Sequence, residues 1–161
     1  MLEFTCANLH PDGQLYAIGT SDGKINVYDV FTGELSGTIG PRPGAVKSMH
    51  FSQNGIWLAE TSVEDNIVRI WDLRKTTAVA FDLEGSSEGG NVRWDRSGQY
   101  LALGGKKGID LWAYQKKEKQ FEKVTAQPLQ ENGVECLDWG VDGKTIICGG
   151  QPDGTIAVLG V

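Results

Sequence analysis

The sequence predicts an all-β fold made of a short unit that is repeated four times. Glycine accounts for 22 of the 161 residues and tryptophan for five, and the chain lacks the runs of Ala, Glu, Lys and Leu that are typical of helices. Four turn motifs, HPDG, SQNG, DRSG and GVDG, end in glycines that are 42, 43 and 45 residues apart. These glycines are Gly13, Gly55, Gly98 and Gly143. Such a period indicates a repeated structural unit rather than one local motif.

Each unit is predicted to contain four strands. First strands are expected near 4–9, 45–51, 90–95 and 133–139, each with a bulky apolar residue four positions before the turn glycine. Second strands follow the turn as QLYAIGT, IWLAETS, QYLALGG and KTIICGG, and third strands as KINVYDV, NIVRIWDL, GIDLWAY and TIAVLGV. Fourth strands are expected near 34–39, 78–83 and 121–126, with none after the last unit. The repeats are therefore placed at about 4–39, 45–83, 90–126 and 133–160.

A period of 40 to 45 residues with a Trp-Asp ending is typical of the blades of a WD-repeat β-propeller. The aromatic residue of the third strand is expected to fill the space between neighbouring blades. An acidic residue six positions earlier lies in a tight turn, where its carboxylate can accept backbone N–H bonds; Lys106 replaces it in the third repeat. The predicted structural blade positions are Asp22, Tyr28, Asp29, Asp65, Trp71, Asp72, Trp112 and Asp153.

The predicted propeller is partial. About fifteen strands make nearly four blades, at the lower limit of the roughly four to eight blades that close a propeller, and the last blade lacks its outer strand. Many propellers complete their final blade with a strand from the N-terminal side. We therefore expect the chain to be the C-terminal part of a larger ring, with exposed sheet edges when it stands alone.

Composition argues against several classes of function. The net charge of -6 provides no basic field for nucleic acid, and the mixed-sign run QKKEKQ at 115–120 is expected to be a solvated loop, so direct nucleic-acid binding is not expected. No apolar stretch approaches the roughly 20 residues of a membrane helix, so no membrane partner is expected. The first residues lack the features of a signal peptide. Cys6, Cys136 and Cys148 form no disulfide pattern, which fits a reducing compartment.

No catalytic constellation is visible in the sequence. His10 and His50 are the two histidines, and neither lies near a candidate nucleophile or a set of metal ligands. The segments GGKKG and GGQPDG lack the spacing of a phosphate-binding loop and are expected to be hairpin turns. The sequence therefore predicts no enzyme, no catalytic residue, no metal and no cofactor in this chain.

Three residues are candidates for a partner surface: Trp57, Glu60 and Arg69. Glu60 stands at a position that is apolar in the other repeats, so its carboxylate is expected either to face the central channel or to pair with a cation such as Arg69. Trp57 stands at a position held elsewhere by Leu, Tyr or Thr, and an exposed tryptophan there would suit a protein partner.

The stretches HPDG, FSQNGIWLAETSVEDNIVRIWDLRK and DRSGQYLALGG resemble the last blades of the pre-mRNA-processing factor 19 family, the U-box ubiquitin ligases of the spliceosomal nineteen complex. The resemblance covers nearly all of the chain and is strongest over 51–105. It implies a nuclear protein whose propeller recruits spliceosomal proteins and ubiquitination substrates in splicing and DNA repair. It also implies a U-box and a tetramer-forming coiled coil upstream. Neither is in this chain, so ubiquitin transfer and tetramer formation are not expected of it.

The chain departs from that family's pattern between its first two blades. WD-repeat proteins usually place Gly-His there, and the imidazole joins the turn aspartate in a hydrogen-bonded network. Here the segment reads IGPRPGAV, so Asp65 is expected to find another partner. Two other functions stay open: a WD-repeat receptor or adaptor of another ubiquitin ligase or of a chromatin complex, and a hydrolase built on a propeller. The hydrolase would need convergent carboxylates or a metal cluster at the channel mouth, of which the sequence gives no sign.

Overall fold

Each repeat forms its own antiparallel sheet in the computed structural model, which describes residues 3–75, 78–86, 90–128, 133–150 and 156–160. We call each sheet a blade. The first blade contains β1 (Phe4–Leu9), β2 (Leu15–Thr20), β3 (Ile25–Asp29) and β4 (Leu35–Ile39), and the second contains β5 (Val46–Phe51), β6 (Trp57–Ser62), β7 (Ile67–Asp72) and β8 (Val79–Glu84). The third contains β9 (Asn91–Trp94), β10 (Tyr100–Gly105), β11 (Gly108–Gln115) and β12 (Gln120–Pro128), and the fourth contains β13 (Val134–Trp139), β14 (Thr145–Gly150) and β15 (Ile156–Gly160).

The described residues contain no helix, and every strand pair within a blade is antiparallel. The predicted all-β, partial propeller is therefore confirmed. The strands follow one another in order across the first, second and fourth sheets, and the third sheet has the same order of neighbours. Within the described part of the chain, the fourth blade has three strands where the others have four.

The four turn glycines share one backbone conformation, which explains why glycine recurs in every repeat. Gly13, Gly55, Gly98 and Gly143 have φ angles of 73°, 69°, 68° and 64°. Their N–H groups donate to the carbonyl oxygen three residues earlier, at 2.8–3.1 Å. Because this left-handed conformation is strained for residues with a Cβ, glycine is favoured at the same point of every first hairpin.

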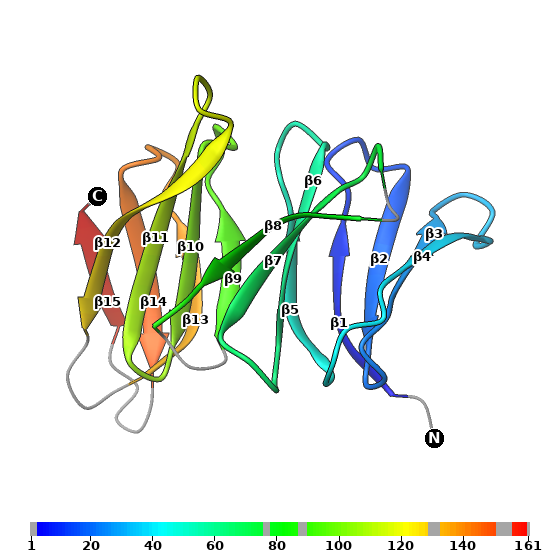
Figure 1. The fold of residues 1–161 in the computed structure, drawn as a ribbon, viewed down its shortest axis with the longest axis horizontal. Coiled ribbons are helices and arrows are strands. Elements are labelled where there is room, and N and C mark those ends of the chain that lie inside the picture. Colours follow the sequence, from blue (N-terminus) through cyan, green and yellow to red (C-terminus); the bar gives the residue numbers. More distant parts are fainter. Residues whose placement is uncertain (1–2, 76–77, 87–89, 129–132, 151–155, 161) are drawn as a thin grey trace.

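The blades follow one another in space as they do in sequence (Figure 1). The first strand of each blade contacts the first strand of the next: β5 touches both β1 and β9, and β9 touches β13. The first blade and the fourth lie at opposite ends of the row (Figure 1). The described residues therefore form an open arc rather than a closed ring.

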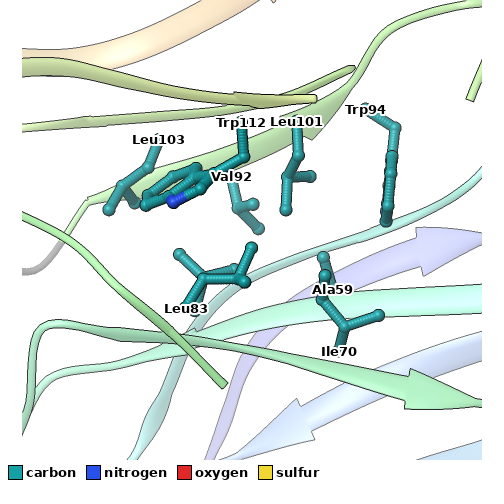
Figure 2. Packing of buried hydrophobic residues seen from close by; sticks show 9 residues of the cluster. Ala59, Ile70, Leu83, Val92, Trp94, Leu101, Leu103 and Trp112 are labelled. Atoms are coloured by element: carbon teal, nitrogen blue, oxygen red, sulfur yellow. The ribbon is translucent and has the colours of Figure 1, made fainter. Parts of the chain in front are cut away.

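The hydrophobic core lies in the three seams, the interfaces between successive blades. One buried cluster joins the first and second blades, another the second and third, and a third the third and fourth. In the middle seam, Leu83 of the second blade lies opposite Trp112 and Leu103 of the third (Figure 2). Burying one such side chain contributes about 1.5–3 kcal/mol, so the seams hold the separate blades together.

The third-strand aromatics point toward the preceding blade. Trp71 is 6% exposed and packs in the seam with the first blade, while Trp112 is buried in the seam with the second. Tyr28 occupies the same position of the first blade, where the described structure has no preceding blade. It is only half-buried and stacks on Tyr16, with ring centroids 5.2 Å apart.

Candidate functional site

In the first seam, a buried ionic network lies where WD-repeat proteins usually place an imidazole. The Arg42 side chain comes from the segment between the first two blades, and its Nη2 donates to Asp65 Oδ1 at 2.5 Å. Its Nη1 lies 3.5 Å from Glu60 Oε1, which also accepts a hydrogen bond from Trp71 Nε1 at 3.0 Å. Arg42 therefore links the tight turn at Asp65, which also accepts the Ile67 N–H, to the tryptophan of the third strand.

This network corrects two expectations about Glu60. Its side chain is 1% exposed, so it is not part of a partner surface. The predicted partner Arg69 instead bonds Asp82 Oδ1 through Nε at 2.8 Å, and Arg42 is the cation that pairs with Glu60. Burial raises the pKa of Glu60, while Arg42 and the Trp71 indole oppose this rise. The sequence hid this pair because Arg42 lies in a Pro-rich segment outside the strands that the repeat pattern aligns.

The aspartates that end the third strands close the following turns. Asp29 Oδ1 accepts the backbone N–H groups of Phe31 and Thr32, each at 2.8 Å. Asp72 holds the Arg74 guanidinium through both carboxylate oxygens, at 2.9 and 2.7 Å. The bond from Thr32 lowers the pKa of Asp29, and the Arg74 side chain lowers the pKa of Asp72. The aspartate of the Trp-Asp pair thus stabilises the turn toward the outer strand.

The turn aspartate of the first blade is bound differently from Asp65. Asp22 accepts a hydrogen bond from Thr20 Oγ1 at 2.6 Å and pairs with Lys24 Nζ at 2.6 Å. The Lys24 contact lowers the pKa of Asp22. Asp153, predicted to have the same place in the fourth blade, lies outside the described residues.

In the third blade the carboxylate lies on the third strand instead of in the turn before it. Asp110 is fully buried on β11, where its oxygens accept bonds from the Ser86 N–H and hydroxyl and pair with Lys123 Nζ at 2.7 Å. Ser86 belongs to the segment between the second and third blades, so Asp110 clamps that segment as Asp65 clamps Arg42. Lys123 also lies over the Trp112 ring. Asp110 is not among the residues predicted from the sequence, although a charge within the apolar run GIDLW is a usable signal.

First strands of successive blades are joined by side chains at one repeated position. Asn8 Oδ1 accepts the Phe51 N–H at 3.0 Å, and His50 Nδ1 accepts the Trp94 N–H at the same distance. Burial, with a smaller contribution from Arg93, lowers the pKa of His50 to about 4. The neutral imidazole is therefore a hydrogen-bond acceptor between two blades, a structural role that explains its position on β5 without any chemistry.

Trp57 is the centre of an aromatic cluster in the middle seam. The cluster, defined here as Trp57, Phe81, Trp94, Tyr114 and Phe121, has ring centroids 4.6–6.2 Å apart. Trp57 was expected to be exposed; it is half-buried and packs against the hydrophobic core instead. The Trp57 ring contacts the other four rings of this cluster, so only part of its surface is left for a partner.

Two hollows lie in the other seams. An apolar one of about 200 Å³ lies in the first seam, between Leu15 and Gly37 of the first blade and Phe51 and Leu73 of the second. A wider one of about 700 Å³ in the third seam is lined by charged residues such as Asp95, Arg96 and Lys144, and also by Tyr100, Val124 and Val141. The parts of the chain that the structure describes hold no group of three or more His, Cys, Asp or Glu residues placed to bind a metal. Those parts also contain no helix of the length and hydropathy needed to cross a membrane.

Sequence comparison decides the family. The model of the WD domain, G-beta repeat matches residues 3–29, 33–72 and 122–158, which is more than half of the chain. The chain belongs to the WD40-repeat family. Residues 73–121, which lie between the second and third matches, contain most of the third repeat, where Lys106 replaces the turn aspartate and Asp110 binds the connecting segment through Ser86. As a WD40-repeat propeller, the chain is a non-catalytic scaffold.

Among curated proteins, the chain is similar to pre-mRNA-processing factor 19 of Oryza sativa subsp. japonica, with 31% identity over 98% of this chain and 30% of the relative. It is 30% identical to pre-mRNA-processing factor 19 homolog 2 of Arabidopsis thaliana, over 99% of this chain and 30% of the relative. Autophagy-related protein 16 of Arabidopsis thaliana is 28% identical over 84% of this chain and 26% of its own length. The resemblance seen in the sequence is thus confirmed, and the chain spans less than a third of the relatives it matches.

Proposed function

We propose that this chain is the partner-recruiting propeller of a nuclear protein that acts in pre-mRNA splicing. The observation that supports the proposal is its similarity to pre-mRNA-processing factor 19 along nearly the whole chain, in two plant proteins at 30–31% identity. The fold is compatible with this role, because rigid blades joined by buried seams present loops and edges for protein partners. Ubiquitin conjugation and DNA repair belong to the same proposal, with the catalytic part supplied from outside these residues.

Splicing in vitro tests the proposal. We expect that removing the longer protein that contains this chain from a splicing-competent nuclear extract leaves pre-mRNA unspliced, and that adding the purified longer protein back restores splicing. Add-back of a version lacking residues 1–161 should fail, since the propeller carries the recruitment. Normal splicing after complete depletion, or full rescue without the propeller, would contradict the proposed function.

A second function is supported by a separate observation. The chain is also similar to autophagy-related protein 16 and, at 25% identity over 95% of its length, to the periodic tryptophan protein 2 homolog of Neurospora crassa. These relatives favour the broader alternative of a WD-repeat adaptor in another complex. Fractionating cell extracts by size separates the two: co-migration with spliceosomal RNA supports the splicing role, and migration without that RNA supports the adaptor.

A further inference from the structure

The apolar hollow of the first seam is a place where the repeat has lost its own side chains. We call it the seam pocket and define it by Leu15, Val27, Gly37, Ile39, Phe51 and Leu73. Its volume is about 200 Å³. Leu15 is half-buried and Gly37 exposed, so the first-blade wall of the pocket is open to solvent.

The strand register shows what occupies the same place one blade later. In the first blade, Leu15 pairs with Asp29 at the end of the third strand, and in the second blade Trp57 pairs with the equivalent Asp72. In the same way, Gly37 pairs with Val27 in the first blade, and Phe81 pairs with Ile70 in the second. The walls of the seam pocket therefore correspond to rings of the aromatic cluster. The corresponding residues are Leu15 and Trp57, Gly37 and Phe81, Phe51 and Trp94, and Leu73 and Tyr114.

The seam pocket is open because small residues replace those rings. A Cβ at Gly37 would meet no other atom within 4 Å, so the space held by Phe81 in the second blade is unfilled here. Leu15 fills less of the seam than Trp57, whose ring lies 5.6 Å from that of Trp94 in the middle seam. An apolar cavity of about 150 Å³ is known to bind benzene. A space of about 200 Å³ with similar walls suits one aromatic ring.

We propose that the seam pocket binds an aromatic side chain from an extended segment of a partner protein that adds to the free edge of β4. β4 is the outer strand of its sheet, and its residues 35–38 are exposed, so its outer N–H and C=O groups can pair with an added strand. Ser36 and Gly37 are small and let that segment approach. This proposal names the kind of partner that the scaffold recruits and rests on the proposed scaffold function.

The charges of the β3–β4 hairpin add a second feature of the partner. Residues 25–39 contain Asp29 and Glu34 and no Lys or Arg. Both residues lie at the turn of this hairpin, where the backbone N–H of Asp29 donates to the backbone carbonyl oxygen of Glu34 at 3.0 Å. On the other wall, the charge of Arg74 is offset by Asp72. A Lys or Arg beside the aromatic residue of the partner segment would complement the carboxylates on the β4 side.

Indole is a suitable probe for the seam pocket, because its binding reports on the pocket whatever the protein does in the cell. In ligand-observed NMR titrations we expect saturable binding to the unmodified chain and binding at least about tenfold weaker to Gly37→Phe, a difference well above experimental error. Gly160→Phe is the matched control, since Gly160 also lies in a strand with nothing within 4 Å of its Cβ position. It should bind indole normally.

The Gly37→Phe chain is expected to fold, because Gly37 does not have a left-handed φ. The new ring would enter the unfilled space of the first seam, which is equivalent to the space that Phe81 fills in the middle seam. Leu15→Trp provides a second way to fill the pocket. Circular dichroism should match the unmodified chain for both. Undiminished indole binding in the two filled variants, or no saturable binding to the unmodified chain, would overturn the proposal.

A peptide selection identifies the partner chemistry. From a phage library of random twelve-residue peptides panned against the longer protein that contains this chain, we expect sequences with Phe, Tyr or Trp next to Lys or Arg. Their binding should be lost in Gly37→Phe and retained in Gly160→Phe. Peptides without an aromatic residue, or insensitive to Gly37→Phe, contradict the proposal. If the pocket fails these tests while depletion still blocks splicing, only the pocket proposal is refuted. If the pocket binds as expected while splicing is normal after depletion, only the splicing role is refuted.

Discussion

A few buried polar side chains hold successive blades of this chain together. Arg42, Glu60, His50 and Asp110 are each buried or half-buried, and each joins one blade to the next or to the segment between them. In a protein interior such polar contacts are strong when they are complete and costly when one partner is removed. Although these residues are few, substituting any one of them should change the stability of the chain strongly.

His50 should make stability depend on pH. Its pKa is about 4 in the folded chain and 6.5 when exposed, so between these values the unfolded state binds a proton that the folded state does not. Its contribution is thus complete above pH 6.5 and is lost as the pH falls to about 4, by up to about 3 kcal/mol. His50→Asn copies Asn8, keeps the acceptor and cannot titrate. Urea denaturation at pH 7, 5.5 and 4 should show a smaller loss in this variant; equal losses would contradict the prediction.

Removing Arg42 should leave Glu60 as a buried charge without its cation. We expect Arg42→Ala to lower the free energy of unfolding by about 3–5 kcal/mol, as breaking a buried ion pair does. Arg42→Ala combined with Glu60→Gln should recover part of this loss, because the neutral amide no longer needs a cation and still accepts the Trp71 N–H. Urea denaturation measures both. A double variant that is less stable than Arg42→Ala would show that Glu60 does not depend on Arg42.

How much an aromatic side chain contributes to stability depends on whether it lies in a seam, as two residues at equivalent positions show. Trp71 is buried against the first blade, whereas Tyr28 has the same place on a blade whose outer face is open. Trp71→Ala should destabilise the chain by about 3–5 kcal/mol, as deletions of buried aromatics do. Tyr28→Ala should cost only about 1 kcal/mol, the value of its stacking on Tyr16. Thermal melting checks both, and similar losses in the two variants would mean that the repeats are misaligned.

The strands could be predicted from the sequence because their signals are local. Each turn glycine, each alternating strand and each Trp-Asp ending lies within a few residues of the structure it specifies. The seams could be predicted only in outline. Arg42 meets Glu60 and Asp65 across segments that share no repeat position, and in the third blade the carboxylate moved from Lys106's place to Asp110. The seam pocket depends on the absence of a side chain at Gly37, which becomes visible only when strand register equates it with Phe81.

For the molecule as a whole, the scaffold function predicts that this chain alone transfers no ubiquitin. The strands that the structure describes belong to propeller sheets. The resemblance seen in the sequence implies that ubiquitin transfer needs a U-box, which lies outside these residues. With ubiquitin, activating enzyme and conjugating enzymes supplied, the purified chain should form no ubiquitin chains on an immunoblot. A known U-box ligase in the same reaction is the positive control. Chain formation that requires this protein would refute the scaffold function.

The open arc gives the whole molecule two hydrophobic ends. On the outer face of the first blade, Leu9, Tyr16, Tyr28 and Leu35 form one row across the four strands. On the outer face of the fourth blade, Ile147 and Val158 pair across β14 and β15 and are 46% and 64% exposed. By their place in the repeat, these two faces correspond to the two sides of an internal seam, so each is shaped to be covered by a blade of this kind.

We therefore expect the isolated chain to self-associate. Size-exclusion chromatography with light scattering should give a mass above 17.5 kDa that rises with concentration. Ile147→Lys with Val158→Lys should reduce association, because charges on one open face prevent it from packing against the apolar row of another copy. Val141→Lys, at an exposed turn residue outside that face, is the matched control and should associate as before. A stable, cooperatively unfolding 17.5 kDa monomer would instead mean that the first and fourth blades meet in solution and that the arc closes on itself.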